Sequence, residues 1–142
     1  MQSPQVHLRP LTVADIPTVT ALWRSCEGVG MSESDDPVHL SAFLARNPGM
    51  SSVAIADGGV VGAVLSGHDG RRGFLYHLAV HPAARRRGIG RQLVDETLRG
   101  LRAAGILKCQ IVVFQVNEDA KRFWLRLGWT PRDDLHAFSK VL

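Results

Sequence analysis

The stretch from Phe74 to Ala104 constrains the fold of this chain most. It opens with "FLYHLAV", which has the composition of a β-strand, and continues through "HPAARRRGIG" into a segment of helical periodicity. The apolar face of that predicted helix consists of Ile89, Leu93, Val94, Leu98 and Leu101. A run of like charge is usually only a solvated face. Here three arginines stand against a Gly-Ile-Gly step, so we expect them at a junction between a strand and the start of a helix.

Further elements are predicted on both sides of this junction. Before it we expect a strand over 6–9, a helix after Thr12, a loop over 28–36, a helix over 36–47, and strands over 51–57 and 60–68 that form an antiparallel meander with 74–80. After it we expect a strand over 108–116 covered on both faces, a helix from Asn117 to Gly128, and a last strand over 135–142. The predicted order is β-α-α-β-β-β-α-β-α-β.

The composition fits a single globular domain over residues 1–142. The chain is 45% hydrophobic and shows no internal repeat, low-complexity tract or linker. Its net charge of +4 suits an anionic partner. No apolar run reaches the roughly 20 residues that span a bilayer, and the N-terminus lacks the apolar centre of a secretory signal. We therefore expect a cytoplasmic protein that does not contact a membrane.

The arginine-glycine junction has the chemistry of an anion-binding site. A helix N-terminus presents unpaired N–H groups and the positive end of the peptide dipole. Glycine at positions 88 and 90 lets a phosphate come close to the main chain, and neighbouring arginines add charge-assisted hydrogen bonds. The sequence therefore predicts a phosphate-bearing ligand at this point.

Several other kinds of site fit the residues less well. A dinucleotide fingerprint needs a third glycine where this chain has Leu93, and a carboxylate that residues 106–115 do not contain. A P-loop needs Gly-Lys-Ser/Thr after its glycines, and Arg91-Gln92 does not supply it. The two cysteines, Cys26 and Cys109, lack the paired spacing of a metal site. We expect both thiols to be reduced and no metal to be bound.

Two motifs resemble the GNAT superfamily of N-acetyltransferases. Residues 85–90, "RRRGIG", fit the family signature of Arg or Gln, two residues, Gly, one residue, and Gly or Ala, and "HLAVHP" precedes them as is typical there. Asn117, Phe123-Trp124 and the Leu127–Trp129 segment resemble the C-terminal motif of the family. The chain is most similar to the small bacterial proteins called YpeA-like, including the "GxDGxRG" turn over 67–73.

The resemblance implies an α/β fold, a single GNAT domain with a mixed central sheet of about six to seven strands flanked by four helices. It also implies acetyl-CoA as co-substrate, with its pyrophosphate held by main-chain N–H groups of 86–91 and its pantetheine arm along the edge of 78–80. Asn117 would reach the same arm. The residues implied to bind acetyl-CoA are Leu78, Ala79, Val80, Arg85, Arg86, Arg87, Gly88, Ile89, Gly90, Arg91, Asn117 and Trp124.

The implied reaction moves an acetyl group to a primary amine by direct attack in a ternary complex. The amine must lose a proton before it attacks, and the departing thiolate must gain one. The family usually supplies the second proton from a tyrosine in the C-terminal motif, where this chain has Trp124, whose indole is too weak an acid. The candidates left among the side chains are Tyr76 and His77, although either could be a structural sheet residue. A water chain, or direct protonation of the thiolate by the tetrahedral intermediate, is the alternative. In a regular strand they point to opposite faces, so at most one would face the acceptor.

Three questions stay open at this level. The acidic residues Glu27, Glu33, Asp35 and Asp36 form either a solvated loop or a surface that attracts a cationic amine. Without the usual tyrosine, the chain could also be a sensor that binds CoA without turnover. A nucleic-acid partner is not expected, because no docking motif accompanies the arginines. The acceptor is a protein N-terminus, a lysine or a small amine, and a homodimer is possible.

Overall fold

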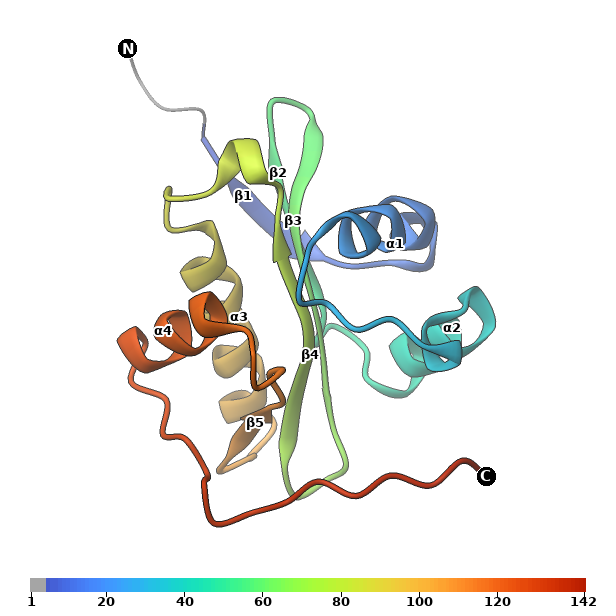
Figure 1. The fold of residues 1–142 in the computed structure, drawn as a ribbon. Coiled ribbons are helices and arrows are strands. Elements are labelled where there is room, and N and C mark those ends of the chain that lie inside the picture. Colours follow the sequence, from blue (N-terminus) through green and yellow to red (C-terminus); the bar gives the residue numbers. More distant parts are fainter. Residues whose placement is uncertain (1–4) are drawn as a thin grey trace. The chain divides into compact units, whose positions relative to one another are not determined.

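The computed structural model describes residues 5–142, and the chain divides into two compact units, one up to Val112 and one over Val113–Leu142. The first unit contains a five-stranded sheet in the order β1-β2-β3-β4-β5 (Figure 1). Its strands are β1 (His7–Pro10), β2 (Ser52–Ala56), β3 (Gly59–His68), β4 (Gly73–Val80) and β5 (Cys109–Ile111). Its helices are α1 (Ile16–Ser25), α2 (Pro37–Arg46) and α3 (Ile89–Ala103).

The predicted meander is confirmed. Strands β1 to β4 pair antiparallel with their sequence neighbours, and β5 joins the edge of β4 in parallel. That parallel pairing follows from the connection, because α3 has to carry the chain back along the sheet before β5 can begin. In Figure 1, α1 and α2 cover one face of the sheet and α3 covers the other.

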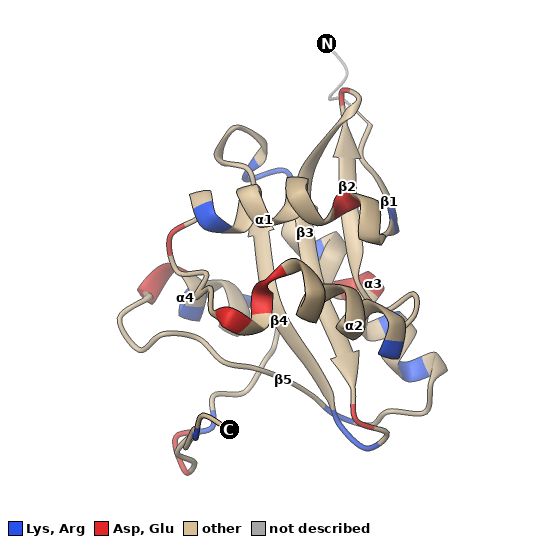
Figure 2. Ribbon diagram, turned by 90° about the vertical axis from the view of Figure 1, so that its right-hand side faces the viewer, with Lys and Arg blue, Asp and Glu red and all other residues tan. Residues whose placement is uncertain are grey.

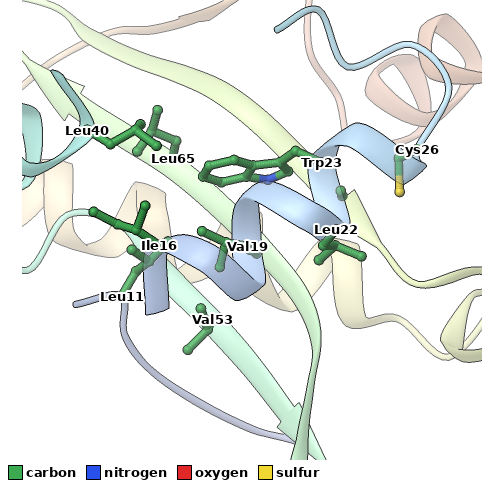
Figure 3. Packing of buried hydrophobic residues seen from close by; sticks show 11 residues of the cluster. Leu11, Ile16, Val19, Leu22, Trp23, Cys26, Leu40, Val53 and Leu65 are labelled. Carbon is green, nitrogen blue, oxygen red and sulfur yellow. The ribbon is translucent and has the colours of Figure 1, made fainter. Parts of the chain in front are cut away.

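The main core lies between the sheet and the two N-terminal helices. Ile16, Val19, Leu22 and Trp23 of α1 are all buried, as their helical spacing predicts. Figure 3 shows the Trp23 ring on the inner side of α1, near Leu40 of α2 and Leu65 of β3. Helix α2 begins after Asp36, whose Oδ1 accepts a hydrogen bond from the His39 N–H at 2.9 Å, and ends at the Asn47-Pro48-Gly49 stop.

Both C-terminal strand predictions are wrong: the first strand is shorter than predicted, and the second is absent. The segment predicted as a strand over 108–116 is paired only at Cys109–Ile111, and Val112 and Val116 are 83% and 89% exposed rather than covered on both faces. The Asn117 N–H bonds the Phe114 carbonyl at 3.0 Å, which turns the chain before α4. Residues 135–142 form no strand. The sheet therefore has five strands instead of six to seven, because apolar alternation forms a strand only where a pairing partner lies alongside.

The second unit contains one helix, α4 (Glu118–Arg126). Asn117 caps it as predicted, its Oδ1 accepting from the Ala120 N–H at 3.0 Å. The helix ends where Gly128 adopts a left-handed φ of 86° and the Trp129 N–H bonds the Trp124 carbonyl. The Trp124 ring packs edge-on against two neighbours, 5.0 Å from Phe123 at an interplanar angle of 82° and 4.7 Å from Trp129 at 63°, between ring centroids.

Residues 5–142 include no helix that is both long and apolar enough to cross a membrane. In the same range, His, Cys, Asp and Glu side chains do not gather in groups of three that could hold a metal ion. Cys26 and Cys109 are free thiols. Burial raises the pKa of the Cys109 thiol to about 11, which makes it a poor nucleophile.

An ion pair fixes the entry of the chain into α1. Both guanidinium NH groups of Arg9 donate to the Asp15 carboxylate, at 2.7 and 2.8 Å. The Thr12 N–H donates to the same carboxylate at 2.8 Å and closes a capping box. The hydrogen bonds from Arg9, together with those from Thr12, lower the pKa of the Asp15 carboxyl from 3.8 to about 2. Burial of the carboxyl acts in the opposite direction but is outweighed.

Substituting Asp15→Asn should lower the free energy of unfolding by about 1–2 kcal/mol at neutral pH. Because the folded-state pKa is depressed, this contribution is complete above 3.8 and disappears as the pH falls through about 2. The stability difference between wild type and variant should therefore close over that window. Urea unfolding at a series of pH values measures it, and a difference that stays constant down to pH 2 contradicts the assignment.

Candidate functional site

The loop between β4 and α3 follows an unusual backbone path. A 3-10 turn at Pro82–Ala84 is closed by His81, whose Nδ1 accepts from the Ala83 N–H at 3.1 Å. Arg86 then adopts a left-handed φ of 66°, and Gly88 a left-handed φ of 77°. A residue other than glycine adopts the left-handed conformation only at a cost in free energy. Its presence at Arg86 therefore indicates that the surrounding fold imposes the path of the loop.

This path leaves the start of α3 open. Gly88 is the N-cap residue and provides no side-chain acceptor, and the first helical bond that closes runs from the Gln92 N–H to the Gly88 carbonyl at 3.0 Å. The N–H groups of Ile89, Gly90 and Arg91 have no protein partner within residues 5–142. Three donors and the positive end of a 15-residue helix therefore point out of the same loop.

The arginines of the loop divide into two kinds. Arg86, Arg87 and Arg91 are exposed and form no ion pair with any described residue. Arg85 instead turns back onto the fold: its Nε donates to the Val80 carbonyl at 3.0 Å, and one NH₂ group lies 3.7 Å from the buried Cys26 thiol. The predicted phosphate role thus suits two of the three consecutive arginines together with Arg91, while Arg85 fixes the end of β4.

The last part of β4 is a free edge within the first unit. β5 pairs with β4 only over Gly73–Leu75, so 76–80 have no strand on that side. The His81 N–H bonds the Val61 carbonyl, which sets the alternation of the β3–β4 ladder. Main-chain groups of Leu78 and Val80 therefore point to the free edge, whereas those of Ala79 point to β3. Of the strand residues predicted to bind a ligand through the main chain, two are placed to do so.

A β-bulge in β4 overturns the prediction that Tyr76 and His77 face opposite sides. Between two consecutive pairs of the ladder, Val64 with Leu78 and Ser66 with Leu75, β4 contains one residue more than β3. The Tyr76 ring lies 5.7 Å from that of Phe43 in α2, and the His77 ring lies 5.1 Å from that of Trp23 in α1, between centroids. Since α1 and α2 cover the same face, the bulge brings both side chains to that face.

His77 is held by a buried carboxylate. Its Nε2 lies 2.7 Å from Asp35 Oδ1, and the two side chains are only 12% and 8% exposed. Asp35 belongs to the loop before α2, which Figure 2 shows as an acidic segment. Glu27, Glu33 and Asp36 are exposed, as both the solvated-loop and the amine-attracting interpretations require, whereas Asp35 is buried. The sequence gives no local signal for this pair, because its members lie on elements far apart in the chain.

Tyr76 borders an open hollow of ≈ 180 Å³ between α2 and the β3–β4 turn. Phe43 and Phe74 form its aromatic walls, and Arg46, His68 and Asp69 contribute polar groups. Burial raises the pKa of the Tyr76 phenol, with a smaller contribution from the nearby Asp69 charge. The phenol therefore stays protonated at neutral pH.

Asn117 and Trp124, the two remaining predicted ligand residues, belong to the second unit. Asn117 is the N-cap of α4, and Trp124 packs among aromatic rings of the same unit. Asn117 is thus a helix cap, and Trp124 is a packing residue of its own unit. Their part in ligand binding stays a prediction.

Comparison with known proteins gives one family. Residues 16–129 match the model of the Acetyltransferase (GNAT) family. Similar solved structures include a PaiA N-acetyltransferase from Thermoplasma acidophilum in complex with coenzyme A (19% identity, 87% of this chain and 88% of that one, TM-score 0.73). A ribosomal-protein-alanine N-acetyltransferase from Brucella melitensis is also similar (19%, 96% and 99%, TM-score 0.73). So is the aminoglycoside N-acetyltransferase AAC(6')-Iy with a bisubstrate analogue of CoA (17%, 97% and 99%, TM-score 0.77). At these identities the structures establish a shared fold.

The Gly88→Ala substitution should destabilise the protein by about 1 kcal/mol, because a Cβ is strained at its φ of 77°. No atom lies within 4 Å of the added Cβ, so the effect reports backbone conformation and not a clash. Gly100→Ala is the matched control in the same helix, where Met50 Sδ lies at an ordinary 3.6 Å. That change should be neutral or stabilising by up to about 1 kcal/mol. Equal effects of the two substitutions in urea unfolding would contradict the open, glycine-dependent helix start.

Proposed function

The chain belongs to the acetyltransferase (GNAT) family, and from this premise we propose that it transfers an acetyl group from acetyl-CoA to a primary amine by direct attack in a ternary complex. The observation that carries the proposal is the open start of α3, where N–H donors and unpaired arginines follow directly on a free strand edge. The family match spans both compact units, which supports one catalytic domain made from the whole chain.

The loop from Arg86 to Arg91 suits the pyrophosphate of acetyl-CoA. Diphosphate oxygens accept hydrogen bonds, and the N–H groups of Ile89, Gly90 and Arg91 are available as donors. The exposed guanidinium groups of Arg86 and Arg87 add charge-assisted bonds. No carboxylate side chain pairs with them in the described residues, so their charge is free for a ligand.

The free edge of β4 suits the amide-bearing pantetheine arm. Leu78 and Val80 direct main-chain groups outward, and an extended amide chain can pair with them as a strand would. The Val80 carbonyl is already bonded to Arg85, which leaves the Val80 N–H and both main-chain groups of Leu78 for the arm. This route leads from the phosphate loop toward the bulge at Tyr76 and His77.

The bulge supplies the two groups that the reaction needs. His77 is suited to accept a proton from the attacking amine, since a neutral imidazole ring has one nitrogen with a free lone pair. Tyr76 lies on the same face and keeps its phenolic proton, so it is suited to protonate the departing thiolate. With this pair, the usual tyrosine of the C-terminal motif is not required, and Trp124 is free to be a structural or CoA-contacting residue.

The site described above does not by itself select one class of acceptor amine. The similar structures include enzymes named for ribosomal-protein alanine and for aminoglycosides, which share only an amine as acceptor. We therefore keep peptide N-termini, lysine side chains and small amines as candidate acceptors.

Binding of the co-substrate can be tested without an acceptor. Substituting Arg86→Gln together with Arg87→Gln should weaken CoA binding about tenfold, the effect of losing roughly 1.4 kcal/mol of charge-assisted contact. The matched control is Arg71→Gln with Arg72→Gln, a second exposed pair in the β3–β4 turn, which should leave the affinity within about twofold. Isothermal titration with CoA measures both. Equal weakening by the two double variants would mean that only net charge is involved and would refute the assigned loop.

Turnover is tested by thiol release from acetyl-CoA with an alanyl peptide, an Nα-acetyl-lysine amide, spermidine and an aminoglycoside. Wild type should release CoA with at least one of them. His77→Ala and Tyr76→Phe should each lower kcat by roughly 10²-fold or more while the affinity for acetyl-CoA changes little. Tight CoA binding with no thiol release from any amine would instead favour a CoA sensor.

A further inference from the structure

The Asp35 carboxylate is anchored on both of its oxygens. Oδ2 accepts the Ser32 N–H at 2.9 Å, which closes the turn at Glu33–Asp35 from within. Oδ1 is left to face His77 Nε2 at 2.7 Å. A carboxylate fixed in this way can hold the imidazole in one orientation without moving itself.

The contact determines which ring nitrogen of His77 is free. A carboxylate only accepts hydrogen bonds, so Nε2 carries the hydrogen that points to Asp35, and in the neutral ring Nδ1 keeps its lone pair. Within residues 5–142, Nδ1 has no hydrogen-bond partner. It is also not among the enclosed atoms that lack one, which are Trp23 Nε1, Ser66 Oγ and Thr97 Oγ1. Nδ1 is therefore not fully enclosed, although the His77 side chain as a whole is only 12% exposed.

Packing against Trp23 also restrains the His77 ring. The Trp23 ring lies 5.1 Å from the His77 ring at an interplanar angle of 55°, and Trp23 is itself fully buried. The imidazole is thus held by an aromatic face and by a charged acceptor, on the face of the sheet to which the bulge also brings Tyr76. A purely structural tether between the loop and β4 would not require a second nitrogen that is not fully enclosed.

We propose that Asp35 is a positioning residue that acts through His77, and that the pair makes His77 Nδ1 the proton acceptor for the amine. This inference rests on the proposed acetyl transfer. The ammonium gives one proton to Nδ1, and the resulting imidazolium is stabilised by the Asp35 carboxylate. The amine nitrogen then bonds to the thioester carbon and the C–S bond breaks. The second nitrogen proton goes to the thiolate through Tyr76, and the imidazolium returns its proton to solvent.

The test is a double-mutant cycle in the full chain, with thiol release measured for the same four acceptors, the alanyl peptide, the lysine amide, spermidine and the aminoglycoside. Asp35→Asn should lower kcat at least about tenfold, a part of the roughly 10²–10⁴-fold that a positioned base contributes, with the KM for acetyl-CoA unchanged. In the His77→Gln background, Asp35→Asn should have no further effect beyond about twofold, because its role passes through His77. Asp36→Asn is the matched control: it removes the same charge one residue away, can still cap α2, and should leave kcat unchanged.

A second readout does not depend on turnover. In ¹⁵N-histidine-labelled protein, the neutral His77 ring should be protonated at Nε2 in wild type, and Asp35→Asn should shift this tautomer population while Asp36→Asn should not. A dominant Nδ1–H tautomer in wild type overturns the inference. So does an equal loss of kcat from Asp35→Asn in both backgrounds, or no loss in an active enzyme. If wild type acetylates none of the four amines, the proposed function fails and the base role fails with it.

Discussion

The extra residue in β4 is the constraint on which the rest of the site depends. In a regular strand, Tyr76 and His77 would lie on opposite faces of the sheet. With two residues of β4 facing one of β3, both reach the face covered by α1 and α2. The strand also loses its partner on the β5 side at this point, so the free edge and the two titratable side chains begin at the same place. One local irregularity thus sets the geometry on which the proposed pantetheine edge and the proposed acid-base groups both depend.

The features that could be predicted from the sequence are those encoded locally. The apolar stripe of α1, the meander and the Asn117 cap depend on residues within a few positions of one another, and the structure contains them. The open start of α3 is also local, because it needs only glycine at position 88 and the lack of a capping side chain. The start of α3 and Asn117 also lie within the motifs that carry the resemblance to the family.

The features that could not be predicted depend on distant partners. Nothing in "FLYHLAV" indicates that β4 will contain one residue more than β3 between two consecutive pairs of the β3–β4 ladder. Asp35 has the same surroundings in sequence as its solvated neighbours, and only the fold brings it to His77. The apolar residues of 112–116 and 135–142 are typical of a strand, but they carry no information about whether another strand is available to pair with them.

The side chain of Arg85 also changes how the basic run should be understood. One of three consecutive arginines is committed to the Val80 carbonyl and the Cys26 thiol, so counting charges overstates what a diphosphate would meet. The remaining donors at Ile89, Gly90 and Arg91 belong to the polypeptide backbone. Backbone donors survive any exchange of side chains that preserves the path of the loop. A conventional alanine scan would therefore leave the backbone donors of the proposed diphosphate site untested, and exchange of its arginines would remove only the side-chain part of that site.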